Sequence, residues 1–535
     1  MATNDERRLD SWKEIAAYLK RDVRTVQRWE RNEGLPVHRK QHGTLGSVFA
    51  FAHELDAWWN RDRAAAPPPP AEPGLARWRL AVLPLRNLSG DPEQDYFAEG
   101  LTEEISAQLS RCDPQRIAVL ARRSVGRALA KAEASLVQEL GATHVLDGSV
   151  RRSGGRVRLS VQLSQARDHA HVFAQSYDRD LHEILALQDE LAREVTAGIT
   201  ATARAPSLGR FAVVDPEAYS ACLMGRQLWA RRSAEAVTRA VAQFERAATL
   251  SPGYAPAHAG LADCYAVLAN PELGWLPPVE AMPRARAAAE RALALDPALG
   301  EGHASLGFVR FWYDWDAAGA AREFARALDL HPAHASARQW RAALLATVDR
   351  VDEAMAELDR ALELDPLSNV LRVERSSILY FERDYDGAAR QARAALALDE
   401  QMVVGHLDLA RALGPQGAHA EALAALERAR ALAPGLPAVT MALGRAHGLA
   451  GDAAAARRAL DELRALGRDR YVPAFHRAAV HAALGEREET LAALEAARDE
   501  RCAYVVHLAK EPAADALRGD PRFEALLPPW AVRAR

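Results

Sequence analysis

The chain has 535 residues, more than one hydrophobic core normally organises, so two to four domains are expected. Apolar residues make up 49% and charged residues 26%, and the net charge of −4 argues against a polybasic membrane binder and a nucleic-acid coat. Any contact with DNA must therefore come from a local basic region.

Cysteine spacing and hydropathy exclude further classes of protein. The cysteines have neither a C-x-x-C pair nor a histidine cluster nearby, so we expect buried thiols rather than a zinc site or disulfides. The four are Cys112, Cys222, Cys264 and Cys502. The amino terminus has no apolar signal segment, and no run approaches the roughly 18 apolar residues of a membrane span. We expect a cytoplasmic protein with no membrane partner, metal or cofactor.

Residues 1–63 read as a small module of their own, because the proline run in the linker 64–77 favours an extended chain. Ser11 and Glu14 form an S-x-x-E capping box, which predicts the start of a helix. The further expected elements are a turn, a second helix, a hairpin wing and a third helix, at Lys20 to Val23, Arg24 to Asn32, Leu35 to Phe49 and Glu54 to Trp59.

Four strings in this module, SWKEIAAYL, RTVQRWE, GLPVHRK and ELDAWW, resemble the MerR and excisionase-type winged helix-turn-helix over about 50 residues. The resemblance implies binding of double-stranded DNA, with Arg24, Thr25 and Arg28 facing the major groove and Arg39 and Lys40 on phosphate. A module kept only for protein docking is the alternative.

The local charge fits that resemblance. Between Lys20 and His42 the sequence has seven Lys or Arg and three acids, an excess of +4 that suits phosphate neutralisation. Arg and Gln also pair with guanine and adenine edges. The candidate DNA contacts are Arg21, Arg24, Thr25, Gln27, Arg28, Arg31, Arg39 and Lys40. One such module offers little contact area, so a homodimer or a paired partner is expected.

Residues 78–204 alternate between strand and helix patterns, which predicts an α/β domain. Expected strands are Leu80 to Pro84, Ile117 to Ala121, His144 to Val150, Val157 to Leu163 and His171 to Tyr177, and expected helices are Leu101 to Ser110, Ala132 to Leu140 and Leu181 to Thr200. The strings AVLPLRNLSGDPEQDYFAEGLTEEISAQLSR and GATHVLDGSVRRSGGRVRLSVQL resemble the TolB amino-terminal-like or FlgO-like domain. That resemblance implies a small interaction domain.

Two charged clusters in this domain leave alternatives open. An acidic cluster could hold a metal in a hydrolase, but no His or Cys joins it, and the dipole of a helix start explains the charges. It consists of Asp91, Glu93, Asp95, Glu99, Glu103 and Glu104. A basic cluster is either a solvated strand face or an anion contact. It consists of Arg151, Arg152, Arg156 and Arg158.

From 213 to 535 strand patterns vanish and a helical repeat begins. The positions that close each helix pair are Pro252, Pro297, Pro332, Pro366, Glu400 and Pro434, in steps of 45, 35, 34, 34 and 34 residues. Small-large-small triplets such as Ala320, Phe324 and Ala327 precede them, on one helix face. This period and pattern are those of the tetratricopeptide repeat.

We expect eight repeats, from 221–254 to 471–504, with an insertion at Asn270 to Val279 and a cap at Pro512 to Leu527. A stacked repeat offers a concave face and no preorganised nucleophile, so a protein or peptide partner is expected there. Trp312, Tyr313 and Trp315 serve packing or anchor a partner. Histidines near the repeat starts are expected to be polar residues of the helix surface rather than metal ligands. They are His258, His303, His334 and His406.

The predicted fold is therefore multidomain: a winged helix-turn-helix, an α/β domain and an all-α tetratricopeptide-repeat superhelix. With the resemblances it implies a DNA-binding transcriptional regulator that couples promoter contact to a protein partner. The alternative is a scaffold for a signalling complex that does not bind DNA. We found no catalytic constellation and expect no enzyme.

Overall fold

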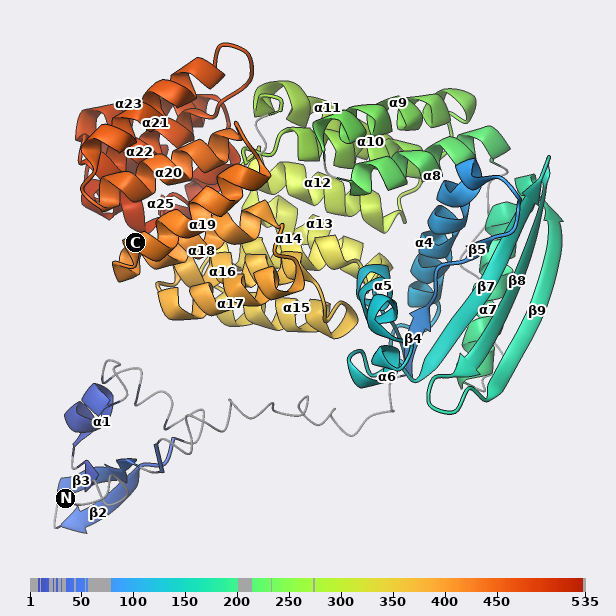
Figure 1. Cartoon of the computed structure of the whole chain (residues 1–535), viewed down its shortest axis with the longest axis horizontal. Coiled ribbons are helices and arrows are strands. Elements are labelled where there is room, and N and C mark those ends of the chain that lie inside the picture. The colour runs from blue at the N-terminus through green and yellow to red at the C-terminus, as the bar shows by residue number, and fades with distance from the viewer. Residues whose placement is uncertain are drawn as a thin grey trace. The chain divides into compact units, whose positions relative to one another are not determined.

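A computed structural model gives the structure of the chain, and it describes residues 8–9, 11–18, 23, 26, 30, 35–42, 45–52, 54–55, 78–200, 214–231, 233–272 and 275–532. Contacts divide the chain into two compact units, Met1–Ala76 and Arg77–Arg535 (Figure 1). We describe each unit by itself.

The described part of the first unit is a three-stranded antiparallel sheet with one helix and its own core. Its elements are β1 Arg8–Leu9, α1 Trp12–Tyr18, β2 His38–His42 and β3 Leu45–Phe51, with strand order β1-β3-β2. Helix α1 starts as the capping box predicts, since Glu14 N donates to Ser11 Oγ at 3.2 Å. The hairpin of β2 and β3 is the one expected within 35–49. The buried core is Leu9, Ile15, Ala16, Val26, Leu35, Ala50 and Leu55.

The amino-terminal part of the second unit is built on a mixed sheet. Its described strands are β4 Trp78–Val82, β5 Arg86–Asn87, β6 Ile117–Val119, β7 His144–Ser153, β8 Arg156–Gln165 and β9 His171–Asp180. The order is β6-β4-β7-β8-β9, with β5 beside β7. Pairs among β4, β5, β6 and β7 are parallel, whereas β7, β8 and β9 form an antiparallel meander. All five predicted strands are present.

Helices cover both faces of this sheet. They are α4 Asp95–Cys112, α5 Arg122–Lys131, α6 Ser135–Gln138 and α7 Ile184–Thr200. Because side chains alternate along a strand, Leu80 and Val82 pack with α4 and α7, whereas Ala81 packs with α5 and α6. The prediction for Ala132 to Leu140 was wrong in extent. Helix α5 lies before it, unpredicted because only Ser124, Val125 and Ala128 of its charged sequence are buried.

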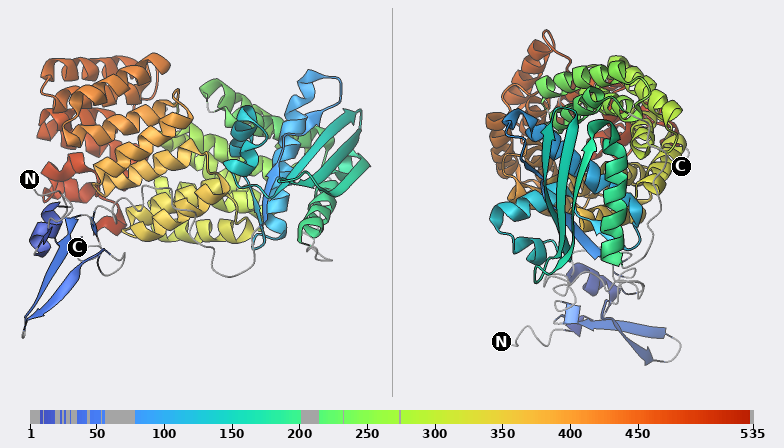
Figure 2. Two further views of the ribbon diagram at one scale, coloured as in Figure 1. Left: turned by 60° about the horizontal axis from the view of Figure 1, so that its bottom comes forward. Right: turned by 90° about the vertical axis from the view of Figure 1, so that its right-hand side faces the viewer.

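The rest of the unit is a solenoid of antiparallel helix pairs (Figures 1 and 2). In the described residues the pairs are α8 Pro216–Ala230 with α9 Ala234–Leu250, α10 Ala255–Leu268 with α11 Pro278–Leu295, α12 Gly300–Trp312 with α13 Ala317–Leu330, α14 Ala335–Thr347 with α15 Val351–Leu364, α16 Asn369–Phe381 with α17 Tyr385–Leu398, α18 Val403–Leu413 with α19 His419–Leu432, α20 Pro437–Leu449 with α21 Ala453–Leu466, and α22 Ala474–Leu484 with α23 Arg487–Asp499. The eight pairs match the expected number of repeats.

Packing within and between neighbouring pairs follows the small-large-small pattern. Phe244, the large residue of its triplet, is 1% exposed and lies so close to α10 that a Cβ on Gly260 would come within 2.3 Å of its ring. A Cβ on Gly307 would lie 2.7 Å from Phe324 in the same way. The small residues therefore set how closely the helices approach. All four cysteines are buried, as expected, and none forms a disulfide.

The sheet and the solenoid meet at a seam with a continuous hydrophobic core (Figure 2). Phe97 of α4 packs edge-on against Tyr219 of α8, with ring centroids 6.2 Å apart. A Cβ on Gly100 would lie 2.9 Å from Leu223, so α4 and α8 are in close contact. The predicted boundary between these parts, after residue 204 and before residue 213, lies outside the described residues.

Polar contacts also cross the seam. Arg226 of α8 forms an ion pair with Glu104 of α4. Ser124 Oγ donates to Asp365 Oδ1 at 2.5 Å and accepts from Leu367 N at 2.9 Å. Ser110 Oγ lies 3.0 Å from His331 Nε2. Each of these buried groups therefore has a partner on the other side of the seam.

Beyond α23 the chain turns back along the solenoid. This C-terminal strap, residues 501–517, contains the short helices Ala503–His507 and Pro512–Leu517, and α24 Pro521–Leu526 and α25 Pro529–Val532 follow it. Phe523 and Leu517 pack on Leu491 and Leu494 of α23, where the predicted cap would lie. The strap also reaches the third to fifth helix pairs, which a simple end cap does not do.

Candidate functional site

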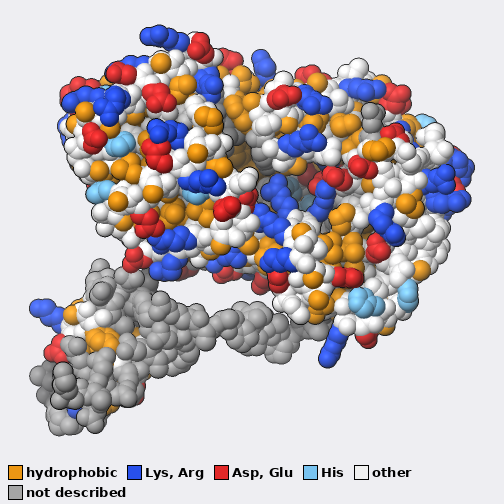
Figure 3. All heavy atoms as spheres, in the orientation of Figure 1, with side chains coloured by type: hydrophobic (Ala, Val, Ile, Leu, Met, Phe, Trp, Pro, Cys, Tyr) orange, Lys and Arg blue, Asp and Glu red, His pale blue; other side chains and the backbone are white. Residues whose placement is uncertain are grey.

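The inner side of the solenoid is hollowed. A large cavity of about 500 Å³ lies among α10, α12, α14, α16 and α18, and a small cavity of about 120 Å³ lies among α18, α20 and α22. The two share a set of lining residues, Glu272, Phe381, Asp408, Arg411, Tyr504 and His507. We call the two cavities together the hollow. The space-filling view shows this face recessed between the early and late repeats (Figure 3).

Polar side chains on successive first helices contact one another along the hollow. Ser305 Oγ of α12 donates to Asp263 Oδ1 of α10 at 2.7 Å. Gln339 Nε2 of α14 donates to Glu374 Oε2 of α16 at 3.0 Å. Arg411 Nη2 of α18 donates to Ser377 Oγ of α16 at 2.6 Å and also pairs with Asp408 of its own helix at 2.7 Å. The hydrogen bonds of this row fix the spacing of the first helices.

Two carboxyl groups of the large cavity lack a cationic partner. Among the described residues, neither Glu272 nor Glu374 forms an ion pair, and Glu272 lies in the insertion after α10, where only its backbone N–H has a hydrogen bond, to Asn270 Oδ1. Burial raises the pKa of Glu272 to about 7, and Asp408 adds to the rise. Burial likewise raises the pKa of Glu374 to about 7. Both carboxyls are therefore poorly stabilised as anions.

Aromatic rings line the same large cavity as these carboxyls. Trp312 and Phe308 of α12 stack with ring centroids 4.3 Å apart, and Trp340 meets Phe308 edge-on at 4.9 Å. Phe381 stacks on His507 of the strap at 4.9 Å. The rings leave part of their surface toward the cavity, which they line. Aromatic faces beside carboxyls form a surface that attracts cations.

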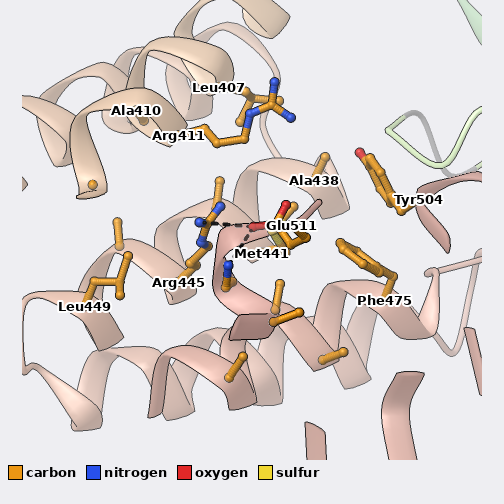
Figure 4. Close-up of a pocket in the computed structure, with 18 of the residues that line it drawn as sticks. Leu407, Ala410, Arg411, Ala438, Met441, Arg445, Leu449, Phe475, Tyr504 and Glu511 are labelled. Atoms are coloured by element: carbon orange, nitrogen blue, oxygen red, sulfur yellow. Dashed lines mark hydrogen bonds and ion pairs between the residues drawn. The ribbon is translucent and has the colours of Figure 1, made fainter. Parts of the chain in front are cut away.

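The small cavity has an apolar wall and one polar end (Figure 4). Met441 and Leu449 of α20 line the wall, and Arg445 points toward Glu511 of the strap. Tyr380 OH donates to Glu511 Oε1 at 2.7 Å and accepts from Arg445 Nη2 at 2.7 Å. The Arg445–Glu511 distance is 3.6 Å. The polar groups at this end of the cavity therefore already have partners within the chain.

The strap forms one side of the hollow. Lys510 Nζ contacts Asp349 at 2.8 Å and Glu382 at 2.7 Å, and Thr347 Oγ1 lies 3.1 Å from His507 Nδ1. The Arg501 guanidinium lies 4.3 Å from the centroid of the Trp315 ring. These contacts tie the carboxy-terminal end to the third, fourth and fifth pairs.

Most predicted DNA-contact residues lie outside the described residues, namely Arg21, Arg24, Thr25, Gln27, Arg28 and Arg31. The predicted helix Arg24 to Asn32 falls there with them, apart from Val26 and Glu30. Arg39 and Lys40 lie on β2, in the expected hairpin, and their side chains are not described. Beside them, His38 Nε2 contacts Glu54 Oε2 at 2.6 Å.

The charged clusters of the α/β part are mostly paired. Arg122 contacts Glu99 at 3.1 Å and Glu103 at 2.8 Å, and Glu104 pairs with Arg226. In the described residues, no group of three or more His, Cys, Asp or Glu could hold a metal ion.

The basic cluster is tied to its neighbours as well. Arg156 and Arg158 both bind Asp178, at 2.6 and 2.7 Å, and Arg152 donates to Ser220 Oγ at 2.9 Å. Three of its four arginines thus stabilise strands or the seam, which leaves little charge for an anion.

The repeat-start histidines have a structural role that the sequence did not reveal. His303 and His406 each donate from Nε2 to the carbonyl six residues earlier, Pro297 O at 3.0 Å and Glu400 O at 2.9 Å. Arg338 makes the equivalent contact to Pro332 O at 2.9 Å. These side chains satisfy a carbonyl of the turn that closes the preceding pair.

Sequence reasoning missed the residues of the hollow. Glu374 and Asp408 stand one period of 34 residues apart, as do Ser377 and Arg411. Polar residues at the same position of first helices were therefore a usable signal. No comparable signal predicted that Glu272 lines the hollow, because the position of its side chain depends on how the insertion folds.

Comparisons with known proteins add the following. No protein-family model matches the sequence. A curated relative, putative adenylate cyclase 3 of Rhizobium meliloti (strain 1021), is 36% identical over 250 residues, which cover 42% of this chain and 41% of that protein. The match thus spans well under half of the relative's length.

Solved structures with a similar arrangement have low identity. PilW, a type IV pilus biogenesis factor, is 20% identical with TM-score 0.30, over 37% of this chain and 90% of its own. A thermophilic tetratricopeptide-repeat protein of Thermus thermophilus is 19% identical with TM-score 0.31, over 37% and 98%. A human IFIT1 dimer with m7Gppp-AAAA is 16% identical with TM-score 0.43, over 64% and 77%. The 34-residue period and the packing of the helix pairs identify the repeat.

In the part of the chain that the structure describes, no helix has the length and apolar character that a membrane crossing requires. The helix pairs, their 34-residue step and their shared hollow make the carboxy-terminal part a tetratricopeptide-type protein-interaction fold.

Proposed function

We propose that the chain is a cytoplasmic DNA-binding transcriptional regulator, in which residues 1–63 contact promoter DNA and the hollow binds a protein or peptide partner. The observation that carries the partner half is the cavity of about 500 Å³, lined by aromatic rings and carboxyl groups on successive first helices. Concave faces of stacked repeats bind partners in this way. The proposal includes no catalytic step, because half of the acidic cluster, Glu99, Glu103 and Glu104, is bound to arginines.

The DNA half rests on the first unit. Its sheet order β1-β3-β2 supplies a hairpin for the wing, and Arg39 and Lys40 lie on β2 of that hairpin. The excess of +4 between Lys20 and His42 favours phosphate contact. A dimer, or a paired partner, provides the contact area that one module lacks.

The test is fluorescence anisotropy of the full chain on duplexes from the neighbouring promoter region at two salt concentrations. We expect sequence-selective binding that weakens with salt, and its loss in the Arg24→Ala, Arg28→Ala double variant and in residues 77–535 alone. Arg246→Ala, in an exposed ion pair of the solenoid, is the matched control. Equal binding by residues 77–535 would overturn the assignment of residues 1–63.

The second candidate is an interaction scaffold without DNA binding. It is favoured by the second unit, whose sheet, repeats and hollow are complete without residues 1–76. No duplex binding by the full chain at low salt would select this candidate, since a basic winged module should then show at least non-specific affinity.

A further inference from the structure

The large cavity of the hollow contains more negative charge than its own cations neutralise. Its carboxyl groups are Asp263, Glu272, Glu374 and Asp408, and its cations are Arg411 and Lys510. Both cations are already engaged, Arg411 with Asp408 at 2.7 Å and Lys510 with Asp349 and Glu382 at 2.8 and 2.7 Å. Glu272 and Glu374 are left without a counter-charge among the described residues.

Burying a carboxylate without a partner costs free energy, and the buried carboxylates at the seam avoid this cost by binding a partner group. Every carboxylate named at the seam has a partner: Glu104 pairs with Arg226 and Asp365 accepts from Ser124. Glu272 and Glu374 face a cavity large enough for a side chain. In the described residues, Glu272 and Glu374 thus combine two features, the lack of an ion pair and a position at an open cavity.

The groups that face Glu272 come from three elements. They are Glu374 of α16, Asp408 and Arg411 of α18, and Tyr504 of the strap. Arg411 is the single cation among them, and Asp408 offsets it. The shared field at Glu272 is therefore negative once its neighbours ionise.

The chain itself shows how a guanidinium is held in this environment. The Arg411 guanidinium lies 4.8 Å from the centroid of Tyr380 and 5.6 Å from that of Phe381, and it ion-pairs with Asp408. The large cavity is lined by the same components, the rings of Trp312 and Trp340 and the two carboxyls that form no ion pair. A planar guanidinium both stacks on rings and forks to carboxylates, which an ammonium does less well.

We propose that the large cavity binds a guanidinium group, an arginine of the partner peptide, between the carboxyls of Glu272 and Glu374 and the rings of Trp312 and Trp340. The proposal deepens the partner half of the proposed function and rests on it. Free arginine or another small guanidine shares the same chemistry, and the test separates the two sources.

The test is calorimetric titration of the full chain at pH 8 with four probes: acetyl-Ala-Trp-Arg-Ala-amide, its citrulline counterpart, its lysine counterpart and free arginine amide. Citrulline keeps the shape of arginine but carries no charge. We expect the arginine peptide to bind at least tenfold more tightly than the citrulline peptide. We also expect at least a tenfold loss in the Glu272→Gln, Glu374→Gln double variant. Glu217→Gln, on the exposed surface of α8, is the control that should bind as the wild type does.

Each outcome is decisive. Binding of the arginine peptide but not of arginine amide assigns the source to a peptide, and equal binding of both assigns it to a free guanidine. Equal affinity for the arginine and citrulline peptides would overturn the charge proposal while leaving a peptide-binding hollow. No binding of any probe up to 10 mM would overturn the guanidinium site and the peptide function of the hollow together, without touching the DNA half.

Discussion

The seam and the hollow are both polar regions inside the second unit, built from the same kinds of side chain. At the seam, Glu104 meets Arg226 and Asp365 meets Ser124, so each polar group has a partner across the interface. In the hollow, Glu374 accepts only from the neutral Gln339, and the Glu272 carboxyl has no hydrogen bond among the described residues; neither forms an ion pair, and both line an open cavity. The polar groups of the seam therefore join the sheet to the solenoid, whereas those of the hollow are free to bind the proposed ligand.

The largest expected effect is at the seam. Arg226→Ala leaves Glu104 partly buried and unpaired, so we expect the free energy of unfolding to fall by about 3 kcal/mol. Urea unfolding followed by circular dichroism measures it. Arg246→Ala, whose ion pair with Glu217 is exposed, should cost no more than about 0.5 kcal/mol. Equal losses in the two variants would mean that the seam pair is no more important than a surface pair.

In the hollow, removing a charged group should raise the free energy of unfolding, whereas at the seam it lowers it. Because burial raises the pKa of Glu272 to about 7, the folded protein binds a proton that the unfolded chain has released, and stability falls as pH rises from about 4.5 to 7. Glu272→Gln removes that loss, so we expect stabilisation of about 1–3 kcal/mol at pH 8 and almost none at pH 4.5. Urea midpoints at the two pH values measure the difference. If Glu272→Gln were less stable than the wild type at pH 8, the Glu272 carboxylate would be stabilising the folded protein, contrary to this prediction.

A second seam contact gives a smaller effect. Ser124→Ala removes two hydrogen bonds and leaves Asp365 and Leu367 N without that partner, for an expected loss of about 1–2 kcal/mol in the free energy of unfolding. Thermal unfolding of the full chain checks it. Ser160→Ala, on an exposed strand face of β8, is the control and should change little. A neutral Ser124→Ala variant would show that the seam does not depend on this contact.

The strap gives the smallest expected effect. Lys510→Ala breaks its contacts with Asp349 and Glu382, which are partly exposed, so the global loss should stay near about 0.5–1 kcal/mol. Local opening of residues 503–517 should increase, and amide hydrogen exchange measures it. Exchange unchanged in the strap would mean that Val506 and its aromatic neighbours hold the strap without Lys510.

Local patterns predicted much of the fold. The 34-residue period, the triplet around Phe324 and the strand alternation around Leu80 each reflect contacts close in sequence or repeated along it, and the structure has the corresponding elements. Helix α5 was missed because its buried face is short and its sequence is charged. Its burial comes from Ala81 and Val145, on strands of the sheet.

The site could be predicted only in part. The concave face followed from the repeat, but the hollow depends on the insertion that places Glu272 and on a strap more than 200 residues further along the chain, Tyr504 included. Neither placement has a local signature. The predicted DNA contacts, Arg24 among them, stay predictions because they lie outside the described residues.

The central claim is that Glu272 lacks a counter-cation in the folded protein. Carbon NMR of the chain labelled at glutamate side-chain carboxyls measures it directly, with the Glu272 resonance identified by its absence in Glu272→Gln. We predict a pKa near 7 for Glu272 in the free protein, falling when the arginine peptide binds. A pKa near the ordinary glutamate value in the free protein, unchanged by the peptide, would contradict the account.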